Sequence, residues 1–361
     1  MASQKPEGAQ FILASTARIV EDGSGRIRIR TGIWNYEEAV IDVSRESPAV
    51  ARSVRAALHA AKEGQVTVAD HLDPELLPIE RANIEKLFND LAQAGILVAA
   101  ADRESQDAIT AALLGRLVSP YPGNPTPGRI VFHSDCPAAI DQAMSLARSM
   151  RVELTLLPEQ AVTRLNEVDL TSRVDGLRTE REIAELRPAL TKGAVLVTCF
   201  LRPSLPLLRN INRLVEGQDH PWINAFVDGP FVSVVGTKSP HTGCFECFEQ
   251  RALARLEDHV AYHDFARFTV GALDPRHTDA PLMSMLTPLA VIEGYLHAAV
   301  GTSRFAGRVL GIHLPTLEIQ TQDLLRMPNC PACGKVSRQR LREINFNSRA
   351  AVDRIISEVL S

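Results

Sequence analysis

Two pairs of cysteines constrain the fold of this chain more than any other feature of its sequence. Cys244 and Cys247 enclose one dipeptide, Cys330 and Cys333 enclose another, and residues 248–329 separate the pairs. Each pair can offer two thiolates from one tight turn, and two pairs complete a tetrahedral, all-sulfur zinc site with no open position for catalysis. We therefore predict a structural Zn²⁺ that joins two distant segments of one domain. The alternatives are a redox-active pair and buried thiols that bind no metal.

The composition is that of an ordinary globular protein. The chain has 361 residues, of which 45% are hydrophobic and 23% charged, enough for two or three domains. A formal net charge of −4 argues against broad nucleic-acid binding, which needs a basic surface. No apolar run approaches the roughly 20 residues that span a bilayer, and the N-terminus lacks the apolar core of a signal peptide. We expect a cytoplasmic protein with reduced cysteines and neither membrane nor nucleic acid as a partner.

One segment divides the chain. Residues 119–128 contain four prolines and two glycines, which sustain neither a helix nor a central strand. We predict an N-terminal domain over residues 1–100, a helix and this linker over 101–128, and a second domain over 129–361.

The N-terminal domain is predicted to contain three strands followed by three helices. The strands are Phe11–Val20, Arg26–Arg30 and Ala39–Val43, which alternate between apolar and polar residues. Apolar residues at helical spacing follow Val50, a short helix is expected from Val66, and a third helix covers residues 81–94. This order is typical of a small winged-helix domain.

The second domain alternates between strands and helices. Continuous apolar runs separated by helical segments predict a mostly parallel, doubly wound α/β sheet covered on both faces. The predicted strands are Arg129–Phe132, Val152–Leu157, Ala194–Phe200 and Trp222–Val227.

The first strand–helix turn of such a sheet is the usual nucleotide position, where glycines let the backbone approach a phosphate. Here residues 133–138 contain no glycine, and Asp135 brings a negative charge. Glu159, in the place of a ribose-binding acid, is interpreted as a solvated surface residue. We expect no nucleotide on this chain.

Two segments around the cysteines resemble a known family. Residues 222–251 read as a strand, D-G-P, a second strand, V-G-T, a loop and then C-F-E-C-F, and residues 324–334 read L-L-R-M-P-N-C-P-A-C-G. These motifs resemble the ThiF-like subunit of azoline-forming cyclodehydratases, which mature thiazole/oxazole-modified microcins, a class of ribosomal peptide natural products. Residues 10–100 resemble the PqqD-like peptide-recognition domain of that family by pattern, and residues 120–345 resemble its adenylating-enzyme-like domain.

The resemblance implies a division of labour. This chain would capture the leader peptide of a precursor and hold no catalytic residue, while a separate YcaO-type subunit uses ATP to activate backbone amides. With no room for a fused YcaO domain after residue 345, the chain is expected to be the stand-alone partner. The resemblance also implies a homodimer and a flavin-dependent azoline dehydrogenase as a further partner.

Leader capture has a plain physical form, because an open strand edge can accept an extended peptide as another strand. The third strand and the third helix would form the two walls of the peptide-binding groove. Ile41→Pro should abolish peptide binding by removing one backbone donor. The alternatives for this domain are DNA binding and a purely structural role. For the whole chain they are an adenylating enzyme that activates a peptide C-terminus and a zinc-stabilised interaction protein. The expected peptide-binding residues are Ala39, Val40, Ile41, Asp42, Val43, Ile84, Leu87 and Phe88.

Overall fold

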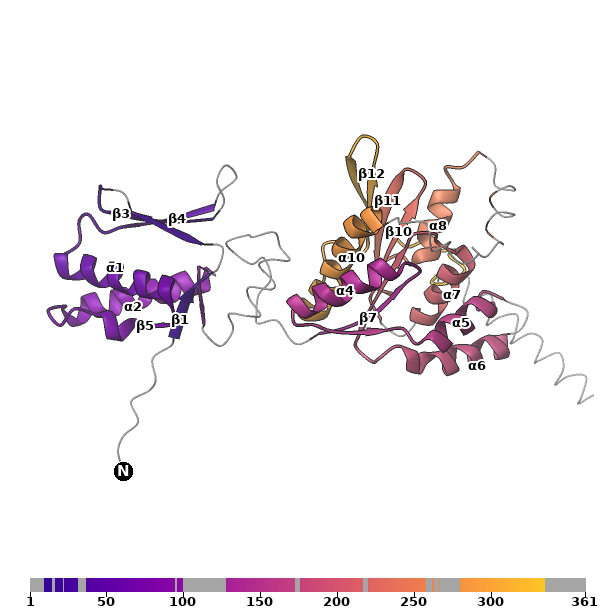
Figure 1. The fold of residues 1–361 in the computed structure, drawn as a ribbon, viewed down its shortest axis with the longest axis horizontal. Helices are drawn as coiled ribbons and strands as arrows, with labels where there is room; N and C mark the ends of the chain where they lie inside the picture. Colours follow the sequence, from indigo (N-terminus) through magenta and orange to yellow (C-terminus); the bar gives the residue numbers. More distant parts are fainter. Residues whose placement is uncertain are drawn as a thin grey trace, which may run out of the picture. The chain divides into compact units, whose positions relative to one another are not determined.

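The computed structural model divides into two compact units, residues 1–125 and 126–361 (Figure 1). The structure describes residues 10–14, 17–21, 23–31, 37–94, 96–99, 128–172, 176–216, 220–257, 262, 266 and 280–334. The predicted helix and linker over 101–128 lie outside the described residues except for Gly128.

The described part of the first unit contains two small sheets and two α-helices. One sheet has the order β2-β3-β4 and is antiparallel, and the other has the order β5-β1-β6. The elements are β1 (Gln10–Leu13), β2 (Arg18–Glu21), β3 (Arg26–Thr31), β4 (Glu37–Asp42), α1 (Pro48–Glu63), β5 (Val66–Thr67), a 3-10 turn (Val68–His71), α2 (Pro78–Gln93) and β6 (Leu97–Ala99).

Two predictions for this unit are wrong. The predicted strand over residues 11–20 is two strands, β1 and β2, that belong to different sheets. Three successive residues of β1, Phe11 to Leu13, are buried, which the alternating pattern of a half-exposed strand does not allow. The expected short helix from Val66 begins instead as strand β5, which pairs with β1.

Local sequence explains where the two helices begin. Ser47 caps α1, because its hydroxyl accepts a hydrogen bond from the Val50 amide at 3.3 Å. Helix α2 starts at Pro78, and the Glu80 carboxylate accepts the amide of Leu77 at 2.9 Å.

The second unit is built on a seven-stranded mixed sheet with the order β13-β12-β11-β10-β9-β7-β8. Strands β8, β7, β9 and β10 are parallel, whereas β11, β12 and β13 are antiparallel to their neighbours. The prediction of a mostly parallel sheet is therefore right for one half only. The strands are β7 (Arg129–Ser134), β8 (Glu153–Leu156), β9 (Val195–Phe200), β10 (Trp222–Asp228), β11 (Phe231–Thr237), β12 (Arg308–His313) and β13 (Glu318–Asp323).

Helices cover both faces of this sheet. On one face α4 and α10 pack against each other and against β7 and β9, and Gly294 of α10 lies close to Val197. On the other face α5, α6, α7 and α8 share one core with residues of the sheet, including the fully buried Trp222. Glu159, expected as a surface residue, is exposed and begins α5. The helices are α4 (Pro137–Ser149), α5 (Glu159–Glu167), α6 (Gly176–Leu186), a 3-10 turn (Arg187–Ala189), α7 (Leu205–Val215), α8 (Phe245–Leu253) and α10 (Ala280–Val300).

The prediction that no apolar run approaches the length of a bilayer span is wrong for helix α10. Its segment Pro281–Val300 passes that test by length and composition, and it is the one such helix in the described part of the chain. However, 61% of the tested window is buried inside the protein, against α4 and the sheet. Its apolar character is that of a core helix.

Candidate metal centre and peptide groove

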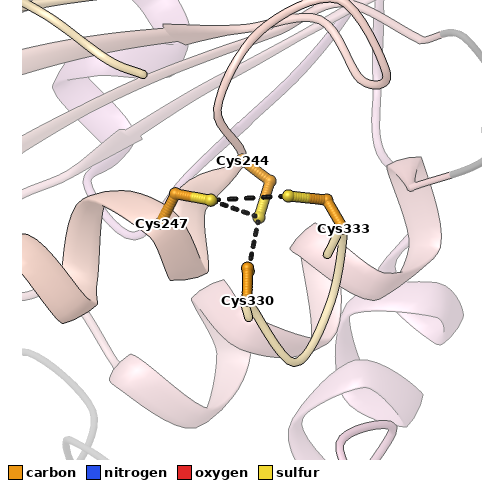
Figure 2. Close-up of side chains that lie close together, drawn as sticks. All are labelled: Cys244, Cys247, Cys330 and Cys333. Atoms are coloured by element: carbon orange, nitrogen blue, oxygen red, sulfur yellow. Dashed lines mark hydrogen bonds between the residues drawn. The ribbon is translucent and has the colours of Figure 1, made fainter. Parts of the chain in front are cut away.

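The four paired cysteines meet at one point in the second unit. Their sulfur atoms all lie within 4.8 Å of one another, although the pairs are far apart in the sequence (Figure 2). The Sγ atoms of Cys244 and Cys247 are 3.9 Å apart, those of Cys244 and Cys330 are 3.6 Å apart, and those of Cys247 and Cys333 are 3.4 Å apart. All four side chains are buried.

These separations fit a tetrahedral zinc ion. With a Zn–S bond of about 2.3 Å, the sulfurs of a regular tetrahedron are about 3.8 Å apart, within the range seen here. Four soft, buried thiols in this arrangement match the donor set of a structural zinc site. The clustering of the four residues is as predicted, and the residues present can hold Zn²⁺.

The backbone around each pair is shaped to turn both thiols inward. Cys244 is the N-cap of α8 and Cys247 lies in its first turn, so the expected loop before the pair is followed directly by a helix. At the other pair, the Gly334 amide donates to the Cys330 carbonyl at 2.9 Å. A Cβ at Gly334 would lie 2.5 Å from that carbonyl oxygen, so this tight turn needs glycine.

N–H groups approach two of the sulfurs. The Asn212 side-chain amide lies 3.7 Å from Cys244 Sγ, and the Met327 backbone amide donates to Cys247 Sγ at 3.4 Å. The side-chain oxygen of Asn212 also accepts the Phe245 backbone amide at 3.0 Å, which links α7 to the start of α8. N–H donors of this kind stabilise thiolates and orient metal ligands.

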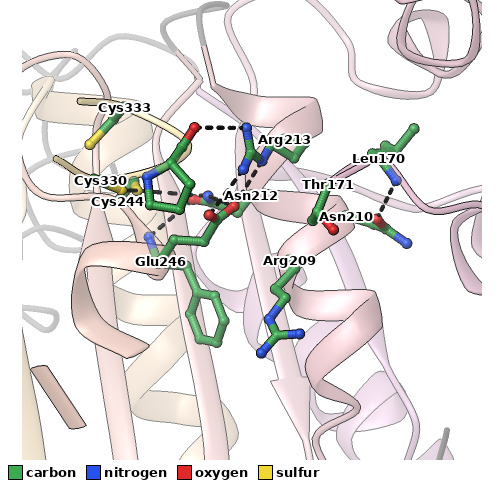
Figure 3. A network of polar contacts seen from close by, with 12 residues as sticks. Leu170, Thr171, Arg209, Asn210, Asn212, Arg213, Cys244, Glu246, Cys330 and Cys333 are labelled. Carbon is green, nitrogen blue, oxygen red and sulfur yellow. Dashed lines mark hydrogen bonds and ion pairs between the residues drawn. The ribbon is translucent and has the colours of Figure 1, made fainter. Parts of the chain in front are cut away.

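A buried ion pair links the two cysteine turns. Arg213 of α7 forms a bidentate pair with Glu246 at 2.8 and 3.0 Å, and it also donates to the Pro331 carbonyl at 3.2 Å (Figure 3). Burial raises the pKa of the Glu246 carboxyl, and Arg213 opposes that shift. The role of Arg213 was not predicted from the sequence, because its partner lies on a distant helix.

The first unit contains a groove between β4 and the helices. It has a volume of about 240 Å³ and combines an apolar floor with a few polar side chains. Its lining residues are Ile41, Asp42, Val43, Glu46, Val50, Val54, Glu80, Asn83, Ile84 and Leu87. Five of the predicted peptide-binding residues are thus brought together: Ile41, Asp42, Val43, Ile84 and Leu87.

The other three predicted residues lie elsewhere. Phe88 is fully buried in the core at 0% exposure, so the structure contradicts its assignment as a peptide contact. Ala39 packs against the same core, and the Val40 side chain is 48% exposed on β4 without lining the groove. Helical periodicity gave the buried face of α2, and of its three predicted residues only Leu87 is partly exposed.

The backbone amides of β4 point alternately toward β3 and toward the open edge of the sheet. Strand β4 pairs only with β3 among the described strands, and the Val43 amide donates to the Gly25 carbonyl at 3.1 Å. Because hydrogen-bonding pairs alternate along an antiparallel ladder, Ile41 also directs its amide toward β3, where it pairs with Ile27. The amides of Val40 and Asp42 then point toward the open edge. The expectation that Ile41→Pro removes an edge donor is therefore wrong.

The carboxylate of Asp135 holds the turn after β7, the usual nucleotide position of such a sheet. Asp135 accepts the amides of Leu201 and Arg202, each at 2.8 Å, at the carboxyl ends of β7 and β9. Burial raises the pKa of the Asp135 carboxyl, and these two amides oppose that shift. Beside it, burial lowers the pKa of His133 to about 4. These contacts lie at the carboxyl ends of the parallel strands, the edge at which sheets of this type bind ligands.

Comparison with known proteins identifies the fold. No family model and no curated protein matches the sequence. The heterocyclase TruD superposes with a TM-score of 0.59 at 14% identity, over 94% of this chain and 44% of that chain. A heterocyclase in complex with substrate and cofactor gives a TM-score of 0.56 at 13% identity, over 90% of this chain and 39% of that chain. E. coli MccB gives 0.48 at 16% identity, over 90% of this chain and 97% of that chain.

The chain has the fold found in heterocyclases. It spans less than half the length of the two heterocyclases that it matches. The expected relation to heterocycle-forming proteins is confirmed for the fold.

Proposed function

We propose that this protein binds the leader peptide of a ribosomally made precursor and presents the precursor to an azoline-forming cyclodehydratase. A separate YcaO-type protein would use ATP to activate backbone amides of the core peptide. Cys, Ser or Thr side chains would then cyclise onto those amides with loss of water. The groove beside β4 carries this proposal, because it combines an open strand edge with an apolar wall in a chain that has the fold of heterocyclases.

In this proposal the leader adds to β4 as another strand of a PqqD-like domain. Its backbone pairs with the outward-facing amides and carbonyls of Val40 and Asp42, and alternate side chains enter the groove against Ile84 and Leu87. Burying two large apolar side chains there contributes about 3–6 kcal/mol before the ordering of the peptide is counted. Backbone pairing gives affinity and the apolar floor gives selectivity.

The second unit acts as a scaffold in this proposal. Zn²⁺ would join the segment 324–334 to α8, and no nucleotide would bind at the turn that Asp135 occupies. Tethering the leader raises the local concentration of the core peptide at the YcaO-type partner to about millimolar for a short flexible linker. A homodimer and an azoline dehydrogenase partner are further parts of the proposal.

Two neighbouring proline variants test the binding mode with purified protein and a fluorescent leader peptide. Val40→Pro removes an amide that points to the open edge and should weaken binding at least tenfold while the fold stays intact. Ile41→Pro removes an amide that pairs with Ile27, so it should lower the melting temperature as well. Unchanged binding by a folded Val40→Pro variant would exclude strand addition at β4.

Reconstitution tests the role itself. The protein, a YcaO-type partner, ATP and a precursor should yield products lighter by one water per ring in mass spectra. Omitting this chain should raise the apparent KM for the precursor far more than it alters the ATP requirement. Full cyclisation without this chain, or ATP–pyrophosphate exchange by this chain alone, would contradict the proposal.

A further inference from the structure

The groove has a negative charge at one end. Ser47, which follows β4 and Glu46 in the chain, donates its hydroxyl to the Glu80 carboxylate at 3.1 Å. The first turn of α2 therefore lies beside the end of β4, and Glu46 and Glu80 line the groove together there. Leu87 lines it nearly two turns farther along α2. One end of the groove is thus acidic and the rest is apolar.

The carboxylates of Asp42, Glu80 and Glu46 at this end differ in the groups that contact them. The Asp42 carboxylate pairs with Arg26 at 3.4 Å and accepts hydrogen bonds from the Ser44 amide and hydroxyl. Its negative charge is therefore already paired with a cation of the protein. The Glu80 carboxylate accepts hydrogen bonds from the Leu77 amide and the Ser47 hydroxyl. These neutral donors fix the position of the carboxylate without neutralising its charge. Glu46 is exposed. No Lys, Arg or His stands among the residues described as lining the groove.

An added strand would place its side chains in a fixed order along this groove. Side chains two residues apart share one face of a strand, so those that face Ile41 and Val43 enter the groove in succession. The next position on that face, beyond Val43, reaches Glu46 and Glu80. An apolar side chain fits the floor at the first positions, and a cation fits the last.

We propose that the occupant of this groove is an extended peptide with apolar side chains at alternate positions and a Lys or Arg on the same face at the end near Glu46 and Glu80. This inference rests on the proposed function and names the class of leader that the groove selects. Two partly exposed carboxylates are enough to distinguish Lys from Glu at that position by about tenfold at low salt. Screening should reduce this ratio as salt increases.

The test uses four synthetic fluorescent peptides and the full chain. Each peptide has Leu at alternate positions, and either Lys or Glu follows on the same face, at the N-terminal or the C-terminal end, so that both strand directions are covered. Anisotropy titrations at low and high salt give the affinities. One Lys peptide should bind about tenfold more tightly than its Glu counterpart at low salt, and the ratio should fall at high salt.

Charge reversal locates the preference. Glu46→Lys should abolish the difference between the Lys and Glu peptides, whereas Glu85→Lys, on the exposed side of α2 outside the groove, should leave it unchanged. Equal binding of Lys and Glu peptides that is lost in Val40→Pro would overturn the charge preference and leave leader binding intact. Binding that Val40→Pro and Leu87→Asp leave unchanged, or no binding of any peptide, would overturn both.

Discussion

Replacing Cys330 with serine should weaken metal binding and destabilise the second unit. Zinc on a structural site contributes about 10–16 kcal/mol of folding free energy, and a neutral hydroxyl does not replace one of the four thiolates. If a quarter of that energy is lost, the cost is about 3 kcal/mol. At roughly 2–4 °C per kcal/mol for a unit of this size, the melting temperature falls by about 6–12 °C.

The structure indicates where this loss acts. Cys330 is fully buried, and the Gly334 amide would still close its turn. The segment that carries this turn would then be linked to α8 by the Met327 amide on Cys247 Sγ and by Arg213, which contacts both the Pro331 carbonyl and Glu246. Elemental analysis should find one zinc per wild-type chain and less than one in Cys330→Ser, and chelator should lower the melting temperature of the wild type more than that of the variant.

Cys136→Ser is the matched control, because Cys136 is also buried but lies outside the cluster. It should retain one zinc per chain. Wild-type protein purified without chelator that holds no stoichiometric metal would refute the reasoning. Equal melting temperatures of Cys330→Ser and the wild type would refute it as well.

Three further predictions concern the second unit. Arg213→Met should cost about 3–5 kcal/mol in urea unfolding by leaving Glu246 buried without its partner, and adding Glu246→Gln should recover part of that loss. Because burial lowers the pKa of His133 from 6.5 to about 4, its protonation opposes folding; wild-type stability relative to His133→Phe should therefore fall by about 3 kcal/mol as the pH falls through that window, and a constant difference would contradict this. Gly294→Ala should cost about 1–3 kcal/mol, since its Cβ would lie 2.4 Å from a side chain of the sheet, whereas Gly311→Ala, with no atom within 4 Å, should melt nearer to the wild type.

The elements that the sequence predicted well are those whose burial leaves a direct pattern. Strand β9 is buried along its whole length and reads as one apolar run. Strand β13 is exposed at every residue, so it carries no apolar pattern, and its pairing with β12 could not be predicted. The break between β1 and β2 was missed because residues 14–17, which separate the two strands in the sequence, include no glycine or proline.

The metal site was predictable because its ligands come in pairs at a spacing that chemistry constrains. The residues that support it were not, because Asn212 and Arg213 meet the cysteine turns only after α7 packs against α8. The groove shows the same limit. Glu46 and Glu80 come together through the contact between Ser47 and α2, which no local pattern records.

The alternating direction of the β4 amides is one feature that the sequence pattern could not predict. Alternating residues define which side chains of β4 share a face, since Ala39, Ile41 and Val43 are apolar and face the helices of the unit. For L-residues, the side-chain face and the strand direction together fix the side to which each amide points. Whether that side is open depends on whether a neighbouring strand occupies it. The hydrogen bond from the Val43 amide to the Gly25 carbonyl shows that β3 lies on the side toward which the Ile41 amide points. The position of β3 therefore decides which residues of β4 have a backbone amide free to bind a peptide. The residue pattern of β4 alone does not contain this information.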